Sequence, residues 1–284
     1  MSNITPRALP LGDATITIIN AGDMMVDMAE EMNAPESAWR SLYGSTFEGS
    51  MPYPSQSVHI ALPGASILVD ANDYALAISL DASYLPPDYT PPPGVVEQLL
   101  SRGIRPEDIT HLVITHAHFD HYAGTTLERN GSYVPRFPNA RVFLGRADWD
   151  HPETQEALRD PDSLDSRTLG VLHKLGMLEL VDGDLELAPA VRIIAAPGES
   201  PGHQLVRVHS QGQTLYCLGD LFHHPVELEQ PAWMAQWADA STNLTSRQAL
   251  IKAALQENAL LLAAHMPLGR LEGTPSRPSW VSFP

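Results

Sequence analysis

The sequence contains a single cysteine, Cys217, among 284 residues. One cysteine cannot form a disulfide within its own chain, which fits a reducing compartment. Basic residues are also scarce, because 17 Lys and Arg stand against 34 Asp and Glu and leave a net charge of −17. Nucleic-acid binding depends on patches of Lys and Arg, so this balance argues against a nucleic-acid partner. It also argues against binding to an anionic membrane surface.

Long apolar runs are missing as well. No stretch approaches the roughly 18 apolar residues that a membrane-spanning helix needs. The first ten residues lack the basic region and apolar segment of a secretory signal. We therefore expect a cytoplasmic protein with no membrane partner. Hydrophobic residues still make up 43% of the chain, which is ample for a buried core and compatible with a single domain over residues 1–284.

The densest chemical signal is the stretch Thr115–His121, which reads Thr-His-Ala-His-Phe-Asp-His and follows a short apolar run. Neutral imidazoles bind metals such as zinc, and a carboxylate adds a harder oxygen ligand. Alternate side chains of an extended backbone share a face, so His116 and His118 can reach one metal together. A short helix beginning near Asp120 would direct Asp120 and His121 toward a second, neighbouring metal.

The rest of the chain alternates strand and helix patterns, which is typical of an α/β fold. The residue patterns predict strands at Ala14–Asn20, Ser57–Leu62, Ser66–Asp70, His111–Thr115, Arg141–Leu144, Val191–Ala196, Leu205–His209, Thr214–Leu218 and Ala259–Ala264. They predict helices at Val95–Arg102, Arg146–Leu158 and Ser246–Glu257, and an extended proline-rich connector at Leu85–Gly94.

Further His and Asp residues stand where predicted strands end: Asp70, His203, Asp220 and His265. Ligand-binding loops of α/β proteins gather at the carboxyl ends of strands, so we expect these side chains to converge on the histidine motif. Asp70 ends an apolar run, where a buried carboxylate needs hydrogen bonds. It is therefore either an anchor behind the metal loop or a turn residue.

Residues 22–57 form a stretch that we predict to be irregular, rich in methionine and aromatic residues. Soft thioethers and aromatic rings concentrated outside regular strands could line an adaptable apolar pocket, as a lid, or could cover a homodimer interface. Ordinary core packing under a long loop is an equal alternative.

Together these markers resemble the metallo-β-lactamase-fold hydrolase superfamily, from about Ser57 to Pro267. The resemblance implies an αββα sandwich, with two mixed β-sheets face to face and helices outside. It also implies two divalent metal ions, and the ligands that it assigns are His116, His118 and His203 for the first ion, Asp120, His121 and His265 for the second, and Asp220 as a bridge. Where many relatives carry a further histidine this chain has Glu199, a position to which the resemblance gives no ligand role. Cys217 is likewise not expected to be a ligand.

Within the superfamily, the segments 219–225 and 230–233 resemble the lactonase and organophosphate-hydrolase-like branch. The candidates for a mostly apolar substrate pocket are Phe119, Phe222, His223, His224, Trp233 and Trp237. For His223 and His224 an outward or structural role is an equal alternative.

The expected reaction is hydrolysis of an ester, with a lactone as the leading substrate, by a hydroxide bridging two metal ions. Asp120 or Asp220 would move the proton to the leaving alkoxide. Zinc is the expected metal, although the ligand types also permit manganese, iron or cobalt. Phosphotriesterase or β-lactamase activity at the same site is an alternative, and so is a mononuclear iron sulfur dioxygenase. A nuclease would need a basic surface, and a binding module without catalysis commonly loses ligands that this chain keeps.

Overall fold

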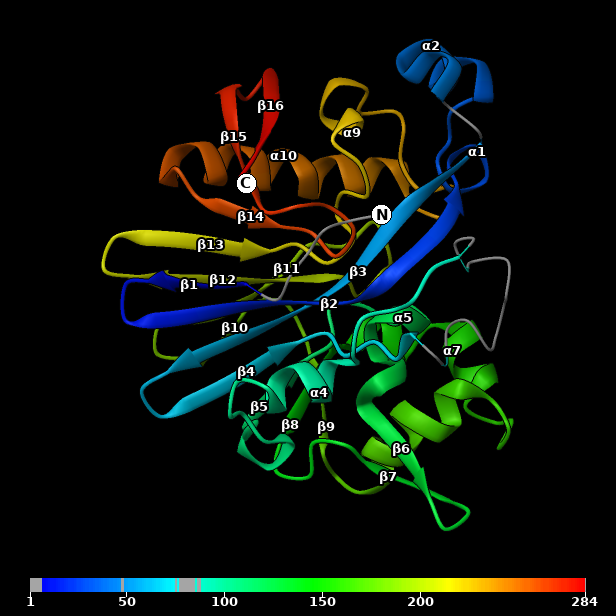
Figure 1. Ribbon diagram of the computed structural model, residues 1–284, viewed down its shortest axis with the longest axis vertical. Helices are drawn as coiled ribbons and strands as arrows, with labels where there is room; N and C mark the ends of the chain where they lie inside the picture. The colour runs from blue at the N-terminus through cyan, green and yellow to red at the C-terminus, as the bar shows by residue number, and fades with distance from the viewer. Residues whose placement is uncertain (1–6, 47–48, 75, 77–84, 86–87, 284) are drawn as a thin grey trace.

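Two β-sheets lie face to face in the computed structural model, which describes residues 7–46, 49–74, 76, 85 and 88–283 (Figure 1). The first sheet has the strand order β1-β2-β3-β4-β5-β8-β9. Its strands are β1 (Arg7–Leu11), β2 (Ala14–Asp27), β3 (Ser50–Leu62), β4 (Ala65–Val69), β5 (His111–Val113), β8 (Arg141–Gly145) and β9 (Leu178–Val181). It is mixed, because β1 to β4 pair antiparallel and β4, β5, β8 and β9 pair parallel.

The second sheet follows the chain from β10 to β16 in order. Its strands are β10 (Leu185–Ala188), β11 (Val191–Ala195), β12 (Gln204–Ser210), β13 (Gln213–Cys217), β14 (Leu260–Leu262), β15 (Gly269–Thr274) and β16 (Arg277–Ser282). All its pairs are antiparallel except β13 with β14. A separate hairpin joins β6 (Thr126–Arg129) to β7 (Ser132–Pro135).

The main hydrophobic core lies between the two sheets. Ile16 and Ile18 of β2 alternate toward it from one side, and Val206 and Val208 of β12 do so from the other. Alternate residues of a strand share a face, so each sheet presents an apolar layer to its partner. The inner faces of the two sheets are therefore held together mainly by burial of aliphatic side chains.

Helices cover the outer face of each sheet. Leu99 of α4 (Val95–Leu100) and Leu172 of α8 (Val171–Lys174) pack against the first sheet, and Leu250 and Ala254 of α10 (Ala240–Glu257) pack against the second. The other helices among the described residues are α1 (Met28–Glu31), α2 (Glu36–Tyr43), α5 (Phe119–Tyr122), α6 (Arg146–Trp149), α7 (Pro152–Ala157) and α9 (Val226–Glu229). There are also the 3-10 turns η1 (Gly44–Thr46), η3 (Pro106–Asp108) and η4 (Ala123–Thr125), and the π-helical segment η5 (Ser166–Gly170). This layering confirms the predicted αββα sandwich. No helix among the described residues is long and apolar enough to cross a bilayer.

The prediction that residues 22–57 are irregular is wrong at both ends of that segment. Strand β2 continues to Asp27, and β3 begins at Ser50, with these two residues paired. The extension is hard to detect because β2 is buried on both faces over most of its length. Such a strand loses the apolar–polar alternation by which a half-buried strand is recognised.

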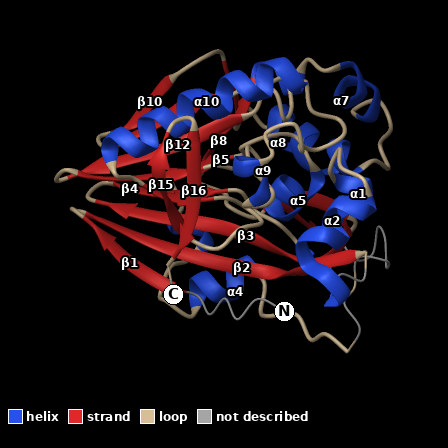
Figure 2. Cartoon of the chain, turned by 90° about the horizontal axis from the view of Figure 1, so that it is seen from above, coloured by secondary structure: helices blue, strands red, loops and turns tan. Residues whose placement is uncertain are grey.

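The turn region of this long hairpin packs back onto its own chain. Met28, Met32 and Trp39 are fully buried there, and the Asn33 amide donates to the Met234 carbonyl at 2.8 Å. Figure 2 shows α1, α2, α5 and α9 at the same end of the sheets. The segment therefore forms part of the wall around that end, while a role in dimerisation stays a prediction.

Two smaller differences have local causes. The helix predicted over residues 146–158 is divided into α6 and α7, because Pro152 can only begin a helix. Helix α10 begins earlier than predicted because Asp239 caps it, accepting from the Thr242 amide at 2.8 Å. The C-terminal hairpin β15–β16 was not predicted. Residues 86–87 of the predicted connector lie outside the described residues.

Close backbone contact fixes two loops at the end of the sheets that carries the histidine motif. Gly145 ends β8, and a Cβ atom built there would lie 2.0 Å from the Gly202 carbonyl oxygen. A Cβ atom at Gly202 would in turn lie 2.5 Å from the Asp148 amide nitrogen. Neither obstacle is a side chain that could rotate away, so both positions require glycine for space.

We expect Gly145→Ala to lower the free energy of unfolding by about 1–3 kcal/mol, because the backbone must separate to admit a methyl group. Gly170→Ala is a matched control, since its Cβ atom would lie 3.3 Å from the tip of Leu158 and 3.4 Å from the Asp165 carbonyl oxygen, which is near ordinary contact. Urea unfolding of the metal-free proteins measures both. Equal stability of the two variants would contradict the close contact at Gly145.

Candidate metal centre

The loop after β5 carries the histidine motif and is tied to the strand beside it. The Thr115 amide donates to Asp70 Oδ1 at 2.7 Å, and the Thr115 hydroxyl donates to Asp70 Oδ2 at 3.0 Å. Asp70 itself has a φ of 57°, a left-handed conformation that Asp tolerates better than most residues. Asp70 also lies 2.9 Å from His121 Nδ1. These contacts support the anchoring role that was one of its two predicted alternatives.

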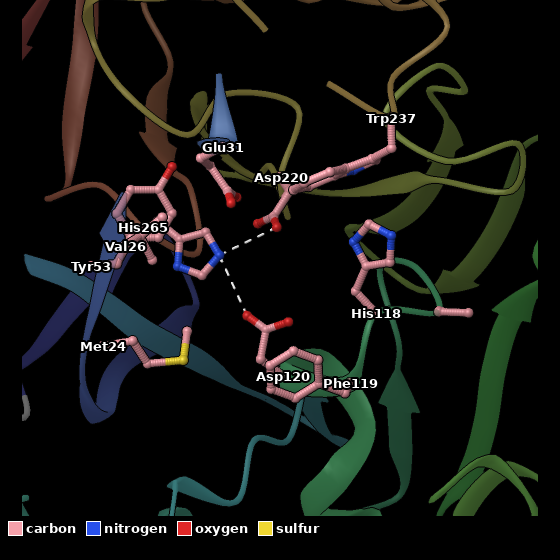
Figure 3. Close-up of a pocket in the computed structure, with 11 residues that line it drawn as sticks. Met24, Val26, Glu31, Tyr53, His118, Phe119, Asp120, Asp220, Trp237 and His265 are labelled. Atoms are coloured by element: carbon pink, nitrogen blue, oxygen red, sulfur yellow. Dashed lines mark hydrogen bonds and ion pairs between the residues drawn. The ribbon is translucent and has the colours of Figure 1, made fainter. Parts of the chain in front are cut away.

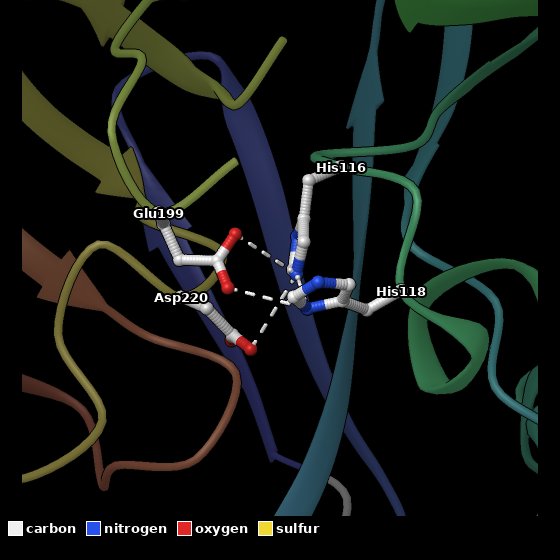
Figure 4. Close-up of side chains that lie close together, drawn as sticks. All are labelled: His116, His118, Glu199 and Asp220. Carbon is white, nitrogen blue, oxygen red and sulfur yellow. Dashed lines mark hydrogen bonds and ion pairs between the residues drawn. The ribbon is translucent and has the colours of Figure 1, made fainter. Parts of the chain in front are cut away.

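One group of ligating atoms is formed by His116, His118, Glu199 and Asp220 (Figure 4). His116 Nε2 lies 2.9 Å from His118 Nδ1. Glu199 approaches both rings, with Oε2 at 3.4 Å from His116 Nε2 and Oε1 at 3.2 Å from His118 Nδ1. Asp220 Oδ2 lies 3.7 Å from His116 Nε2. Their ligating atoms all lie within 4.8 Å of one another.

A second group is formed by Asp120, His121 and His265. The Nε2 atoms of His121 and His265 each lie 3.5 Å from Asp120 Oδ2. The same two nitrogen atoms each lie 3.2 Å from Asp220 Oδ2. The two groups thus meet at Asp220, as the resemblance implied for a bridging residue.

The atoms of the two groups fit divalent metal ions. Glu199 Oε2 and Asp220 Oδ1 are buried without a hydrogen-bond partner among the described residues. Buried carboxylate oxygens are costly in that state, and a bound cation is the usual compensation. Imidazole nitrogens together with carboxylate oxygens suit zinc, iron, cobalt or manganese.

Glu199, to which no ligand role was assigned, occupies the place predicted for His203. Both ring nitrogens of His203 are directed elsewhere: Nδ1 lies 3.1 Å from the Ala196 carbonyl oxygen, and Nε2 accepts from the Asp220 amide at 3.2 Å. The prediction that His203 belongs to the first group is therefore wrong. His203 instead supports the backbone of Asp220 from behind.

The reason lies in the turn between β11 and β12, where Glu199 and His203 are four residues apart. Asp148 accepts hydrogen bonds from the Ser200 hydroxyl at 2.8 Å and from the Gly202 amide. It also accepts from the Ala117 amide at 3.0 Å. One buried carboxylate thus joins this turn to the histidine motif and sets which of its residues faces His116.

The orientations of three ligands are fixed by hydrogen bonds to their outer atoms. Trp237 Nε1 donates to Glu199 Oε1 at 2.7 Å. His265 Nδ1 lies 2.8 Å from the Pro54 carbonyl oxygen, and His121 Nδ1 lies 2.9 Å from Asp70 Oδ2. A proton on Nδ1 leaves Nε2 of each ring with a free lone pair directed at Asp220.

Electrostatics favour the protonation states that metal ligands require at Glu199, Asp220 and His116. At His118, His121 and His265 burial lowers the pKa, but the neighbouring carboxylates outweigh burial and raise it above the ordinary value. Burial raises the pKa of Glu199, but the imidazoles of His116 and His118 outweigh it and hold that pKa below its ordinary value. Burial likewise raises the pKa of Asp220, and His265 and His121 lower it well below the ordinary range. Burial lowers the pKa of His116. Ionised carboxylates beside a neutral imidazole are ready to bind a cation.

A cavity of about 330 Å³ opens over the two groups (Figure 3). That size is at the lower end of the range for small-molecule sites. Phe119 and Trp237 line it, as predicted. The full lining is Met24, Val26, Glu31, Tyr53, Ala117, His118, Phe119, Asp120, Asp220, Trp237 and His265.

Four other predicted substrate contacts do not line this cavity. Phe222 is buried, and the Arg247 guanidinium carbon lies over the Phe222 ring, 4.8 Å from the ring centroid. His224 Nε2 lies 2.6 Å from the Tyr43 hydroxyl, and Trp233 packs on Trp39 with ring centroids 5.3 Å apart. His223 is buried behind Asp220, with Nε2 at 3.6 Å from Oδ2.

Sequence reasoning named only part of the cavity wall. Met24 and Tyr53 belong to the methionine-rich segment and line the cavity, which fits the pocket alternative. Met28, Met32 and Trp39 of the same segment are buried in a hydrophobic cluster, which fits the alternative of core packing. Glu31 and Val26 carried no such signal. A glutamate on a short helix reads as a surface residue until its helix is placed against the site.

Comparisons with known proteins agree with this geometry. An N-acyl homoserine lactonase of Bacillus cereus is 26% identical over 180 residues, which are 63% of this chain and 64% of that protein. N-acyl homoserine lactonase AttM of Azorhizobium caulinodans is 25% identical over 181 residues, 61% of this chain and 64% of that protein. The chain thus spans a little under two thirds of the length of these relatives.

Solved structures share the fold at low sequence identity. The dizinc quorum-quenching lactonase AidC, in complex with the product N-hexanoyl-L-homoserine, superposes with a TM-score of 0.78 at 18% identity and covers 98% of this chain and 97% of its own. The hydrolase AbOPH also superposes with a TM-score of 0.78 at 18% sequence identity, and the match covers 99% of this chain and 99% of its own. The sequence pattern of the metallo-beta-lactamase superfamily matches residues 54–265. This chain therefore belongs to the metallo-β-lactamase superfamily, as its sequence motifs indicated.

Proposed function

We propose that this protein is a dinuclear metal-dependent hydrolase that opens a lactone. The observation that carries the proposal is the meeting of two groups of ligating atoms at Asp220, beneath a small cavity lined by both apolar and charged side chains. The relatives named N-acyl homoserine lactonase support the choice of a lactone among the possible esters.

His116, His118 and Glu199 would hold the first ion and Asp120, His121 and His265 the second, with Asp220 between them. A pair of bound divalent ions lowers the pKa of water toward neutrality and polarises a carbonyl oxygen. The first ion would have two imidazoles and two carboxylates. Its harder oxygen ligands broaden the choice of metal beyond zinc, toward manganese or iron.

The chain's own residues then position the substrate and move protons. Phe119 and Met24 supply apolar surface that excludes water from one side of the cavity. Asp120 Oδ2 faces the Nε2 atoms of His121 and His265, while Asp120 Oδ1 has no hydrogen-bond partner among the described residues. Oδ1 is thus placed to accept a proton and return it to the leaving alkoxide.

We expect the purified protein to contain about two divalent ions per chain and to hydrolyse γ-butyrolactones faster than aryl esters, phosphotriesters or a β-lactam. Mass spectrometry of the metals and initial rates on that panel measure both. Faster turnover of paraoxon or of nitrocefin would replace the lactonase proposal with phosphotriesterase or β-lactamase activity. One iron per chain, with oxygen consumption on a persulfide, would replace it with the sulfur dioxygenase.

The assignment of Glu199 in place of His203 predicts different metal contents for two variants. Glu199→Ala should lose one ion per chain, because the first site keeps only His116, His118 and the shared Asp220. His203→Ala should retain two ions, since neither of its nitrogens faces the cluster. Metal content per folded chain, with circular dichroism as the control for folding, separates the two. Loss of an ion only from His203→Ala would reverse the assignment.

Asp220→Ala should abolish most lactone turnover, because its carboxylate serves both groups of ligands. The expected loss of turnover exceeds the roughly 10- to 100-fold loss that follows when a residue hydrogen-bonded to a metal ligand is changed. Asp70→Asn provides that comparison, since it weakens only the support of His121 and Thr115. Rates at saturating zinc measure both variants, and an Asp220→Ala variant with full turnover would contradict the bridging role.

A further inference from the structure

Glu31 is the one carboxylate of the cavity wall that neither group of ligating atoms includes. It comes from α1, on the turn of the long β2–β3 hairpin, far in sequence from the histidine motif. Figure 3 shows its side chain directed toward Asp220 and His265 across the open part of the cavity. Its charge acts on both of these residues.

The position of Glu31 is fixed by the backbone of α1. Asp27 caps this helix by accepting from the Ala29 amide at 2.8 Å. The Gln236 amide donates to the Glu31 carbonyl at 3.1 Å, and Met32 forms an isolated bridge with Ala235. Glu31 is therefore held against the same loop that carries Trp237, and its carboxylate needs little ordering when a ligand binds.

The Glu31 carboxylate has no hydrogen bond or ion pair within the described part of the chain, although burial raises its pKa. A partly buried carboxylate without a donor is costly to the folded protein. None of the described residues that line the cavity is a Lys or Arg. The wall can therefore accept a hydrogen bond at Glu31, and it would repel an anionic group placed there.

We propose that Glu31 determines substrate specificity by accepting a hydrogen bond from an N–H group beside the scissile ester. This inference rests on the proposed hydrolytic function. The donor is the amide N–H of an acylated amine or a free ammonium. Because Glu31 lies beside the residues that bring the two metal groups together, the N–H group belongs within a few bonds of the reacting carbonyl.

Three lactones test this role. γ-Butyrolactone lacks an N–H group, α-acetamido-γ-butyrolactone carries a neutral one, and α-amino-γ-butyrolactone carries an ammonium at about pH 6.5. For zinc-loaded Glu31→Ala we expect kcat/KM to fall about 10- to 100-fold on at least one nitrogen-bearing lactone, mainly through KM. For the same variant, kcat/KM on γ-butyrolactone should change by less than about threefold.

Glu31→Gln identifies the donor, because the amide oxygen still accepts a hydrogen bond but carries no charge. If Glu31→Gln retains activity on the acetamido lactone, the donor is a neutral amide. If Glu31→Gln loses activity on the amino lactone, the donor is an ammonium. Glu30→Ala is the matched control, since Glu30 lies on the same helix and is exposed. Equal losses on all three lactones, or no loss on any, would overturn the proposal.

A binding measurement keeps this inference separate from the proposed reaction. Titration calorimetry of zinc-loaded protein compares 2-pyrrolidinone with 3-acetamido- and 3-amino-2-pyrrolidinone, which resist hydrolysis. If no lactone is turned over, but the nitrogen-bearing lactams bind about tenfold tighter through Glu31, the hydrolase proposal fails and the role of Glu31 stands. If lactones are turned over and all three lactams bind alike, the role of Glu31 fails alone.

Discussion

The structure depends on the convergence of imidazoles and ionised carboxylates in a buried site without Lys or Arg. Asp120, Glu199 and Asp220 bring three carboxylates together, and two of their fully buried oxygen atoms have no hydrogen-bond partner among the described residues. Such a cluster is unfavourable in isolation, since buried charges repel one another and lack solvation. Bound cations would replace this net repulsion between carboxylates with net attraction. The surrounding contacts are best understood as the means of holding the cluster ready for them.

These contacts form a continuous outer layer made from residues distant in sequence. Asp70 anchors the start of the histidine motif through Thr115, and Asp148 joins the motif to the turn that carries Glu199. His203 supports Asp220 through its backbone amide. Because each of these side chains links two loops, displacing one strand would move ligands of both groups. The face-to-face sheets supply the rigid frame that such precision requires.

The hairpin β2–β3 brings further side chains to the metal groups. It extends beyond the sheet, folds back through α1, and brings apolar and acidic side chains over the metal groups. Met28 and Met32 anchor it in the core, so it is packed as part of the domain wall. The ligand cluster would determine the reaction, while the hairpin with Glu31 would determine which molecule reaches it.

The sequence by itself determined the family, the sandwich architecture and most of the cluster. These features are local. Short stretches of sequence are enough to indicate where strands end, where proline and glycine form turns, and how His116 to His121 are spaced. Only the tertiary structure decided between Glu199 and His203 and brought Glu31 into the cavity. In the eight-residue turn between β11 and β12, Glu199 and His203 stand four positions apart. Which of them faces inward depends on Asp148, which the sequence places more than fifty residues away. The entry of Glu31 depends equally on backbone contacts to residues 234–236, so no local pattern could reveal it.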